Sequence, residues 1–177
     1  AGANANSTTP RGVSALSLAI ANGNAAMVAL LLKSGANANQ LEPAGESMLM
    51  MAAHTGVLPV VEALLRHGAQ VEFRDAAFGQ TALMFAARAG HTDVVATLLA
   101  HGAQPNAATR LGTAPAFIAP NSVPGFGFGV GILRGGVPAD RGRREPAPGG
   151  MTPLHYAARH DHAAAAELLI RAGSAVN

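Results

Sequence analysis

Two short phrases recur along this chain at a nearly constant interval. One is a Gly-Ala phrase, read as SGANAN from residue 34 and as HGAQPN from residue 101. The glycines of this phrase are Gly2, Gly35, Gly68, Gly102 and Gly173. The first three steps between them are equal to within one residue, and the last is slightly more than twice as long. A second phrase, read as GQTALMFAA from residue 79 and GMTPLHYAA from residue 150, keeps the same spacing. A fixed period of about 20–50 residues is the signature of a solenoid of stacked supersecondary units.

The long last step covers about two periods, so it predicts a degenerate unit between the third and the last. Gly112 follows Gly79 by one period, and Gly136 follows Gly102 by one period. We therefore expect one domain over residues 1–177, in which residues 1–9 are the tail of a preceding unit. Five units are expected to follow, at about residues 10–42, 43–76, 77–109, 110–148 and 149–177.

The clearest unit, residues 79–106, predicts two short amphipathic helices. Thr81 is a good N-cap for a helix that starts at Ala82, and Gly90 would end that helix. Thr92 or Asp93 would then cap a second helix. The apolar stripes of the two helices are expected to contain Leu83, Ala86, Ala87, Val94, Val95, Leu98 and Leu99. Neither helix can bury its stripe alone, so we expect an all-α solenoid of stacked helix–turn–helix units joined by finger loops.

The fourth unit departs most from this pattern. Pro115, Pro120 and Pro124 would cut its first helix short, and the alternating glycines of PGFGFGVGILRGG weaken its second. We expect an irregular fourth unit in which Ile132 and Leu133 still pack within the stack. The finger loop that follows, residues 137–150, is longer than the others and is typical of a functional or disordered loop.

The same glycines raise the alternative of a nucleotide-binding loop. A dinucleotide fingerprint needs the spacing G-x-G-x-x-G between a strand and a helix, whereas the glycines at 125, 127, 129 and 131 alternate strictly. A phosphate-binding P-loop needs G-K-[ST], and no Lys follows here. The repeat explains the segment better than nucleotide binding does.

The repeat resembles that of ankyrin-repeat proteins, over nearly all 177 residues. The signature Gly-x-Thr-Pro-Leu-His-x-Ala-Ala is complete only in the last unit. It comprises Gly150, Thr152, Pro153, Leu154, His155, Ala157 and Ala158. The first three units replace Thr-Pro-Leu-His by SALS, SMLM and TALM, and so lack the Thr–His pair that ties turns in the family. The resemblance implies a curved solenoid that acts mainly by binding proteins.

The resemblance also implies where a partner would bind: at the finger tips, at the residue after the opening Gly, and before the turn between helices. Carried over to this chain, and with Phe73 and the three arginines of the long finger added, the candidate contacts are Leu41, Glu46, His54, Phe73, Phe78, Gln80, Arg88, Arg110, Arg141, Arg143, Arg144, Arg159 and His160. Phe73 and Phe78 are expected to be exposed, and the arginines predict a basic end that meets acidic groups. An ordinary solvated face is the alternative interpretation.

Histidines gather near the C-terminus, which raises the question of a metal or catalytic site. The repeat accounts for them, because His155 belongs to the signature and His160 and His162 fall in the expected exposed turn between helices. Zinc sites need three or four convergent ligands, and no Ser/His/Asp arrangement can be argued. We therefore expect a non-enzymatic protein with no cofactor and no metal. Met48, Met50 and Met51 are interpreted as core residues, with an adaptable contact surface as the alternative.

Composition narrows the class of partner. Net charge is only +2, with a single Lys and few aromatic residues, so we expect no nucleic-acid partner. No apolar run reaches the roughly 18 residues of a membrane span. The chain contains no Cys, which excludes disulfides and is compatible with export without fixing the compartment. The excess of Ala and of Arg over Lys is typical of a GC-rich bacterial genome.

The ends of the repeat array leave two functional hypotheses. Neither end has the polar face of a capping repeat, so we expect either an internal slice of a longer protein or ends covered by further copies. The first hypothesis is a scaffold that binds another protein through finger loops and concave face. The second is a structural subunit that assembles end to end into an array or filament, since head-to-tail contacts that do not close make filaments.

Overall fold

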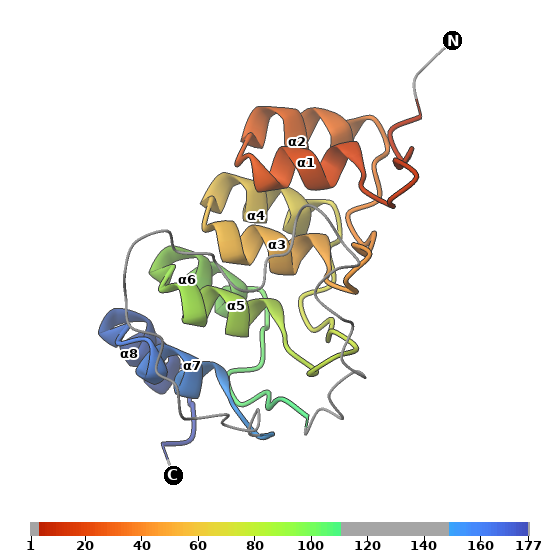
Figure 1. The fold of residues 1–177 in the computed structure, drawn as a ribbon. Helices are drawn as coiled ribbons and strands as arrows, with labels where there is room; N and C mark the ends of the chain where they lie inside the picture. The colour runs from red at the N-terminus through yellow and green to blue at the C-terminus, as the bar shows by residue number, and fades with distance from the viewer. Residues whose placement is uncertain (1–3, 111–148, 177) are drawn as a thin grey trace, which may run out of the picture.

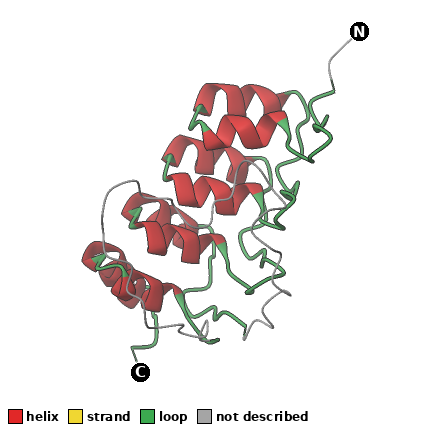
Figure 2. Cartoon of the chain, viewed as in Figure 1, coloured by secondary structure: helices red, strands yellow, loops and turns green. Residues whose placement is uncertain are grey.

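The computed structural model describes residues 4–110 and 149–176, and this part of the chain is helical. Its eight helices are α1 (Ala15–Ala21), α2 (Ala25–Lys33), α3 (Met48–Thr55), α4 (Leu58–Arg66), α5 (Ala82–Ala89), α6 (Thr92–Ala100), α7 (Pro153–Arg159) and α8 (Ala163–Arg171). They form four antiparallel pairs stacked side by side (Figure 1). Loops gather along one edge of the stack as fingers (Figure 2). The all-α repeat fold is therefore confirmed.

Local signals explain where several helices begin and end. The Ser14 and Ser47 hydroxyls accept hydrogen bonds from the third backbone N–H of α1 and α3. Ser17 also returns a side-chain bond to the Ser14 backbone, so serine replaces the Thr–His pair of the family signature in the first unit. Gly56 ends α3 and Gly90 ends α5, each with a positive φ that glycine adopts without strain.

Two expected caps differ from the structure. Helix α6 begins at Thr92 itself and follows His91, so neither Thr92 nor Asp93 is the N-cap residue. Instead, Thr92 Oγ1 donates to the Gly90 carbonyl and Asp93 Oδ1 accepts from the next backbone N–H. Thr81 does precede α5, yet its buried hydroxyl makes no capping bond. Helices α5 and α6 therefore begin without a side-chain cap.

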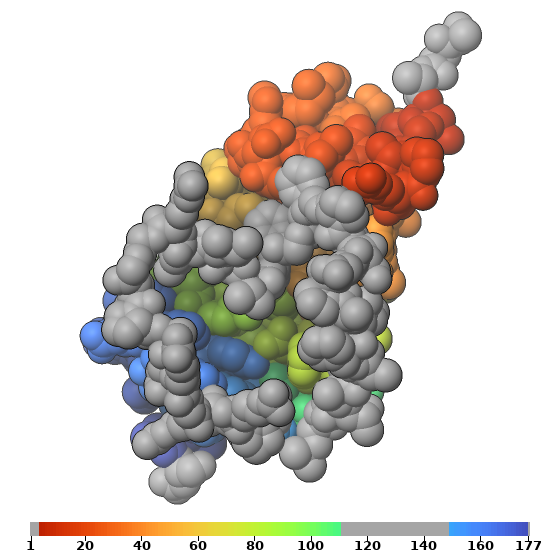
Figure 3. All heavy atoms as spheres, in the orientation of Figure 1, coloured from red at the N-terminus to blue at the C-terminus, as the bar shows by residue number. Residues whose placement is uncertain are grey.

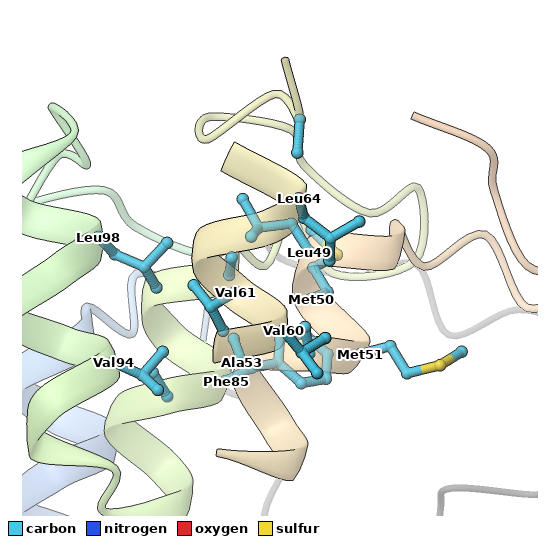
Figure 4. Packing of buried hydrophobic residues seen from close by; sticks show 14 of the residues in the cluster. Leu49, Met50, Met51, Ala53, Val60, Val61, Leu64, Phe85, Val94 and Leu98 are labelled. Atoms are coloured by element: carbon cyan, nitrogen blue, oxygen red, sulfur yellow. The ribbon is translucent and has the colours of Figure 1, made fainter. Parts of the chain in front are cut away.

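The buried apolar side chains lie both within each helix pair and between neighbouring pairs. The predicted stripe residues of α5 are buried, as are Val94, Val95 and Leu98 of α6, whereas Leu99 is half-buried. Met48, Met50 and Met51 are buried, which confirms their core assignment. Side chains from neighbouring pairs join one cluster, in which Phe85 of α5 reaches the residues of α3 and α4 (Figure 4). Fully burying each large apolar side chain contributes about 1.5–3 kcal/mol.

The last pair stacks directly on the third. Helix α7 contacts α5, and α8 contacts α6. Asn106 Nδ2 donates to the Gly173 carbonyl (2.9 Å), and Ala175 N donates to Asn106 Oδ1 (2.7 Å). Asn39 makes the same two bonds between the adjacent first and second units, to Gly68 and Gln70. This differs from the expected stack, in which a remodelled fourth unit stands between the third and the fifth.

The finger loops show how the third and last units come to be neighbours. In each described finger a backbone N–H donates to the carbonyl that faces it across the finger, in the pairs Thr9–Val13, Glu42–Glu46, Asp75–Gln80 and Thr109–Met151. Residues 10–12, 43–45 and 76–79 separate the first three pairs, whereas residues 110–150 separate the fourth. The extra residues are therefore inserted at the tip of one finger. The predicted packing of Ile132 and Leu133 concerns residues outside the described ranges.

Two histidines in the turns between helices, His91 and His162, link adjacent units and are half-buried. His91 Nε2 lies 3.1 Å from the His54 carbonyl oxygen, and His162 Nε2 lies 3.1 Å from that of Arg88. The sequence placed His162 in an exposed turn, but it is half-buried because it packs on the preceding unit. Within the described ranges, no helix has the length and apolar character needed to cross a bilayer.

Candidate partner-binding site

Equivalent positions of successive units form rows along one face of the stack. The residues after the opening Gly of each phrase are Val13, Glu46, Gln80 and Met151. The row at the ends of the first helices comprises Ala21, His54, Arg88 and Arg159. We call the surface that carries these rows the inner face. Because the repeat has a fixed period, side chains distant in sequence become neighbours on this face.

A pocket of about 360 Å³ opens on the inner face where the third and last units meet. Six of the predicted contact residues line it, namely Phe78, Gln80, Arg88, Arg110, Arg159 and His160. Thr109, Met151 and Tyr156 complete its described lining. Met151 follows Gly150 and so occupies the position of Gln80 in the last unit, although it is not among the predicted contacts. Tyr156 and Thr109 face the pocket only because the last unit stacks directly on the third.

Hydrogen bonds across the junction hold the pocket wall. Gln80 Nε2 donates to Tyr156 Oη (2.7 Å), which joins the start of the third unit to the middle of α7. Arg110 N donates to the Phe78 carbonyl (2.8 Å), so adjacent fingers are tied. The Asp75 carboxylate accepts from Phe78 N and Gln80 N, which fixes the third finger from within. These hydrogen bonds therefore fix the backbone that carries the pocket residues.

The pocket is basic. Three guanidinium groups line it, and no Asp or Glu is among its described lining residues. The Arg88 guanidinium stands 5.0 Å from the centroid of the Phe85 ring, a cation–π contact that holds it in place. Partial desolvation lowers the pKa of His160, and Arg159, Arg88 and His162 lower it further. His160 therefore favours its neutral form beside the fixed positive charges.

Acidic residues lie on the neighbouring second unit. Glu46 occupies the position equivalent to Gln80; burial, Asp75 and Glu42 raise its pKa, while Arg88 opposes them. Burial, Arg88 and His91 lower the pKa of His54, whose ring meets the Phe85 ring edge-on at 6.3 Å. Glu46 and His54 thus share the inner face but are not among the residues that line the pocket.

The remaining predicted contacts are scattered. Leu41 is exposed on the second finger, and Phe78 is exposed at the pocket rim. Phe73 was expected to be exposed, but it is half-buried because it packs against the core cluster. Arg141, Arg143 and Arg144 lie outside the described residues. In the part of the chain that the structure describes, no group of three His, Cys, Asp or Glu could hold a metal ion.

The stacked helix–turn–helix pairs with a row of fingers define a helical repeat solenoid. A family model for ankyrin repeats (three copies) matches residues 16–109, and one for a single ankyrin repeat matches residues 149–177. The chain therefore belongs to the ankyrin-repeat family. No curated protein matches it significantly. The residues between the two matches, 110–148, coincide with the insertion at the tip of the fourth finger. Ankyrin repeats generally mediate protein–protein interactions.

Proposed function

We propose that this chain is a non-enzymatic recognition module that binds a segment of another protein on its inner face. The supporting observation is the pocket at the junction of the third and last units. Phe78, Gln80 and Arg88, which occupy three different positions of the repeat, lie together there with Arg110 and Arg159. Its volume lies within the range of about 300–1,000 Å³ that is typical of ligand pockets. Arginine and aromatic side chains are enriched in interface hot spots.

Selection from a random peptide display library tests this function. Peptides selected on the chain should lose at least about tenfold in affinity when Phe78→Ser and Arg110→Ala are introduced together, since hot-spot truncations cost about 2 kcal/mol or more. Leu30→Gln is the matched control, because Leu30 is exposed on α2 and lies outside the pocket lining. Selected peptides that bind equally to both variants would place recognition elsewhere on the molecule.

The second candidate function is end-to-end assembly into an array, favoured by the surface at the first layer of the stack (Figure 3). Met27 and Leu30 are 44% and 58% exposed there, whereas their equivalents Val60 and Ala63 are 0% and 2% exposed beneath the first layer. Ile170 is likewise exposed, 47%, on the last helix. Light scattering over a concentration series tests assembly. Growth that Leu30→Gln abolishes supports it, and a monomer at every concentration excludes it.

A further inference from the structure

The side chains that line the pocket also indicate which class of ligand it would bind. Arg88 and Arg159 occupy the same position in two stacked units, so their side chains lie in one row. Arg110 reaches the pocket from the finger beside them. Guanidinium groups present several N–H donors in a planar fork that matches a carboxylate. Three such groups in a cavity of about 360 Å³ make a site for negative charge on a small group.

The pocket is not uniformly polar. Phe78 and Met151 line it together with the cations, on the side of the fingers. Phe78 is 36% exposed, so a bound group would cover apolar surface that faces water. A ligand that suits this lining carries carboxylates next to an apolar side chain. Short acidic-hydrophobic stretches of a polypeptide have that composition.

The surroundings of the pocket argue against a long polyanion. Glu46 lies on the second unit and Glu42 on the finger that leads to it, and Glu46 is close enough to Arg88 for the two charges to influence the Glu46 pKa. A nucleic acid that filled the pocket and continued along the inner face would meet these carboxylates. The chain as a whole carries 12 Lys and Arg against 10 Asp and Glu, which is no extended basic field. A short acidic segment avoids this repulsion, because it can place its carboxylates in the pocket without extending to Glu46 and Glu42.

We infer that the pocket between the third and last units binds a short acidic-hydrophobic segment of a partner protein, with carboxylates against Arg88, Arg110 and Arg159. The inference rests on the proposed function, because it names the partner chemistry of the same face. Gln80 and Tyr156 serve as positioning residues, since their mutual hydrogen bond fixes the wall between the two units. Exposed charges are screened by salt, so the interaction weakens as ionic strength rises.

Fluorescence anisotropy on the whole chain tests the inference with two labelled eight-residue probes. One alternates Glu with Leu, and the matched probe has Gln in place of Glu. The Glu probe should bind at least about tenfold more tightly than the Gln probe. Arg88→Gln combined with Arg110→Gln should remove this preference. Arg66→Gln, which neutralises an exposed arginine on α4, is the control and should retain it.

Each other outcome overturns the inference. Equal binding of the two probes, or no binding of the Glu probe, removes the role of the carboxylate. Equal binding of an eight-residue oligothymidylate would show general attraction of polyanions instead. If non-acidic peptides from the display library bind at the pocket while the Glu probe does not, the inference fails and the proposed function stands. Library peptides that ignore the pocket variants count against the proposed function itself.

Discussion

The ring of His162 stands over Gly90, with its Nε2 atom 3.1 Å from the carbonyl oxygen of Arg88. A Cβ at position 90 would lie 2.6 Å from His162 Nδ1, so only glycine leaves room for the ring. His91 stands over Gly56 in the same way, with its own bond to the unit below. Each helix-ending glycine therefore also provides the contact site for the next unit. This relationship locks the last unit to the third without an intervening layer.

Replacement of Gly90 by Ala should destabilise the stack by about 2 kcal/mol or more. The residue has φ +76°, which costs an L side chain about 1 kcal/mol, and the new methyl group would displace His162. The melting temperature should fall by about 4–8 °C. Gly35→Ala is the matched control, because Gly35 has φ +89° but open space around its Cβ. Equal losses for the two variants would contradict the role of the histidine contact.

Deletion of residues 111–148 should leave the stack intact. The deletion joins Arg110 to Gly149 and leaves three residues between Thr109 and Met151, the same spacing as between Thr9 and Val13. The finger bonds can then form across an ordinary tight loop. Thermal unfolding followed by circular dichroism should give one cooperative transition at an unchanged melting temperature. A clear fall in the melting temperature would instead mean that the deleted residues support the third and last units.

Replacement of Glu72 by Asn should stabilise the third unit by about 0.5–1 kcal/mol. Asn39 and Asn106 each donate to a glycine carbonyl of the following unit and accept a backbone N–H from it. Glu72, at the equivalent position, accepts from Gln104 N but has no N–H to donate. The melting temperature should rise by about 1–3 °C. Asn39→Asp, which removes a donor at the equivalent site, should lower it, and an unchanged value in both would refute the argument.

Replacement of Glu46 by Gln should make stability less dependent on pH. Burial raises the Glu46 pKa in the folded chain, so folding disfavours the ionised form. The wild-type chain therefore loses stability as pH rises through that pKa, and Gln removes the loss. Thermal unfolding should show a gain of about 1–2 °C near pH 7 that vanishes near pH 4. Glu62→Gln on the exposed side of α4 is the control. A variant less stable than wild type at neutral pH would show that the Glu46–Arg88 attraction dominates.

Much of the candidate site follows from repeat register alone. Phe78, Gln80, Arg88 and Arg159 were all predicted as contacts from their register in the repeat, and all four line the pocket. Phe73 was predicted less well, because a loop position in the sequence does not reveal that its ring packs against the core. Tyr156 was missed, since its bond to Gln80 joins positions 76 residues apart. Such contacts depend on which units are neighbours.

The sequence specifies the helix pairs, because glycine ends, apolar stripes and the serine caps of the first two units act within one unit. It also determined that the units must stack, since a single pair cannot bury its apolar surface. The order of stacking, in contrast, depends on contacts between units that lie far apart in the sequence. The glycines at positions 112 and 136 keep the repeat period and are compatible with a fourth layer. Their spacing, however, does not reveal which units make stabilising contacts with one another. The bonds from Thr109 to Met151, and from Asn106 to Gly173, place the last unit directly on the third, and that contact creates the pocket.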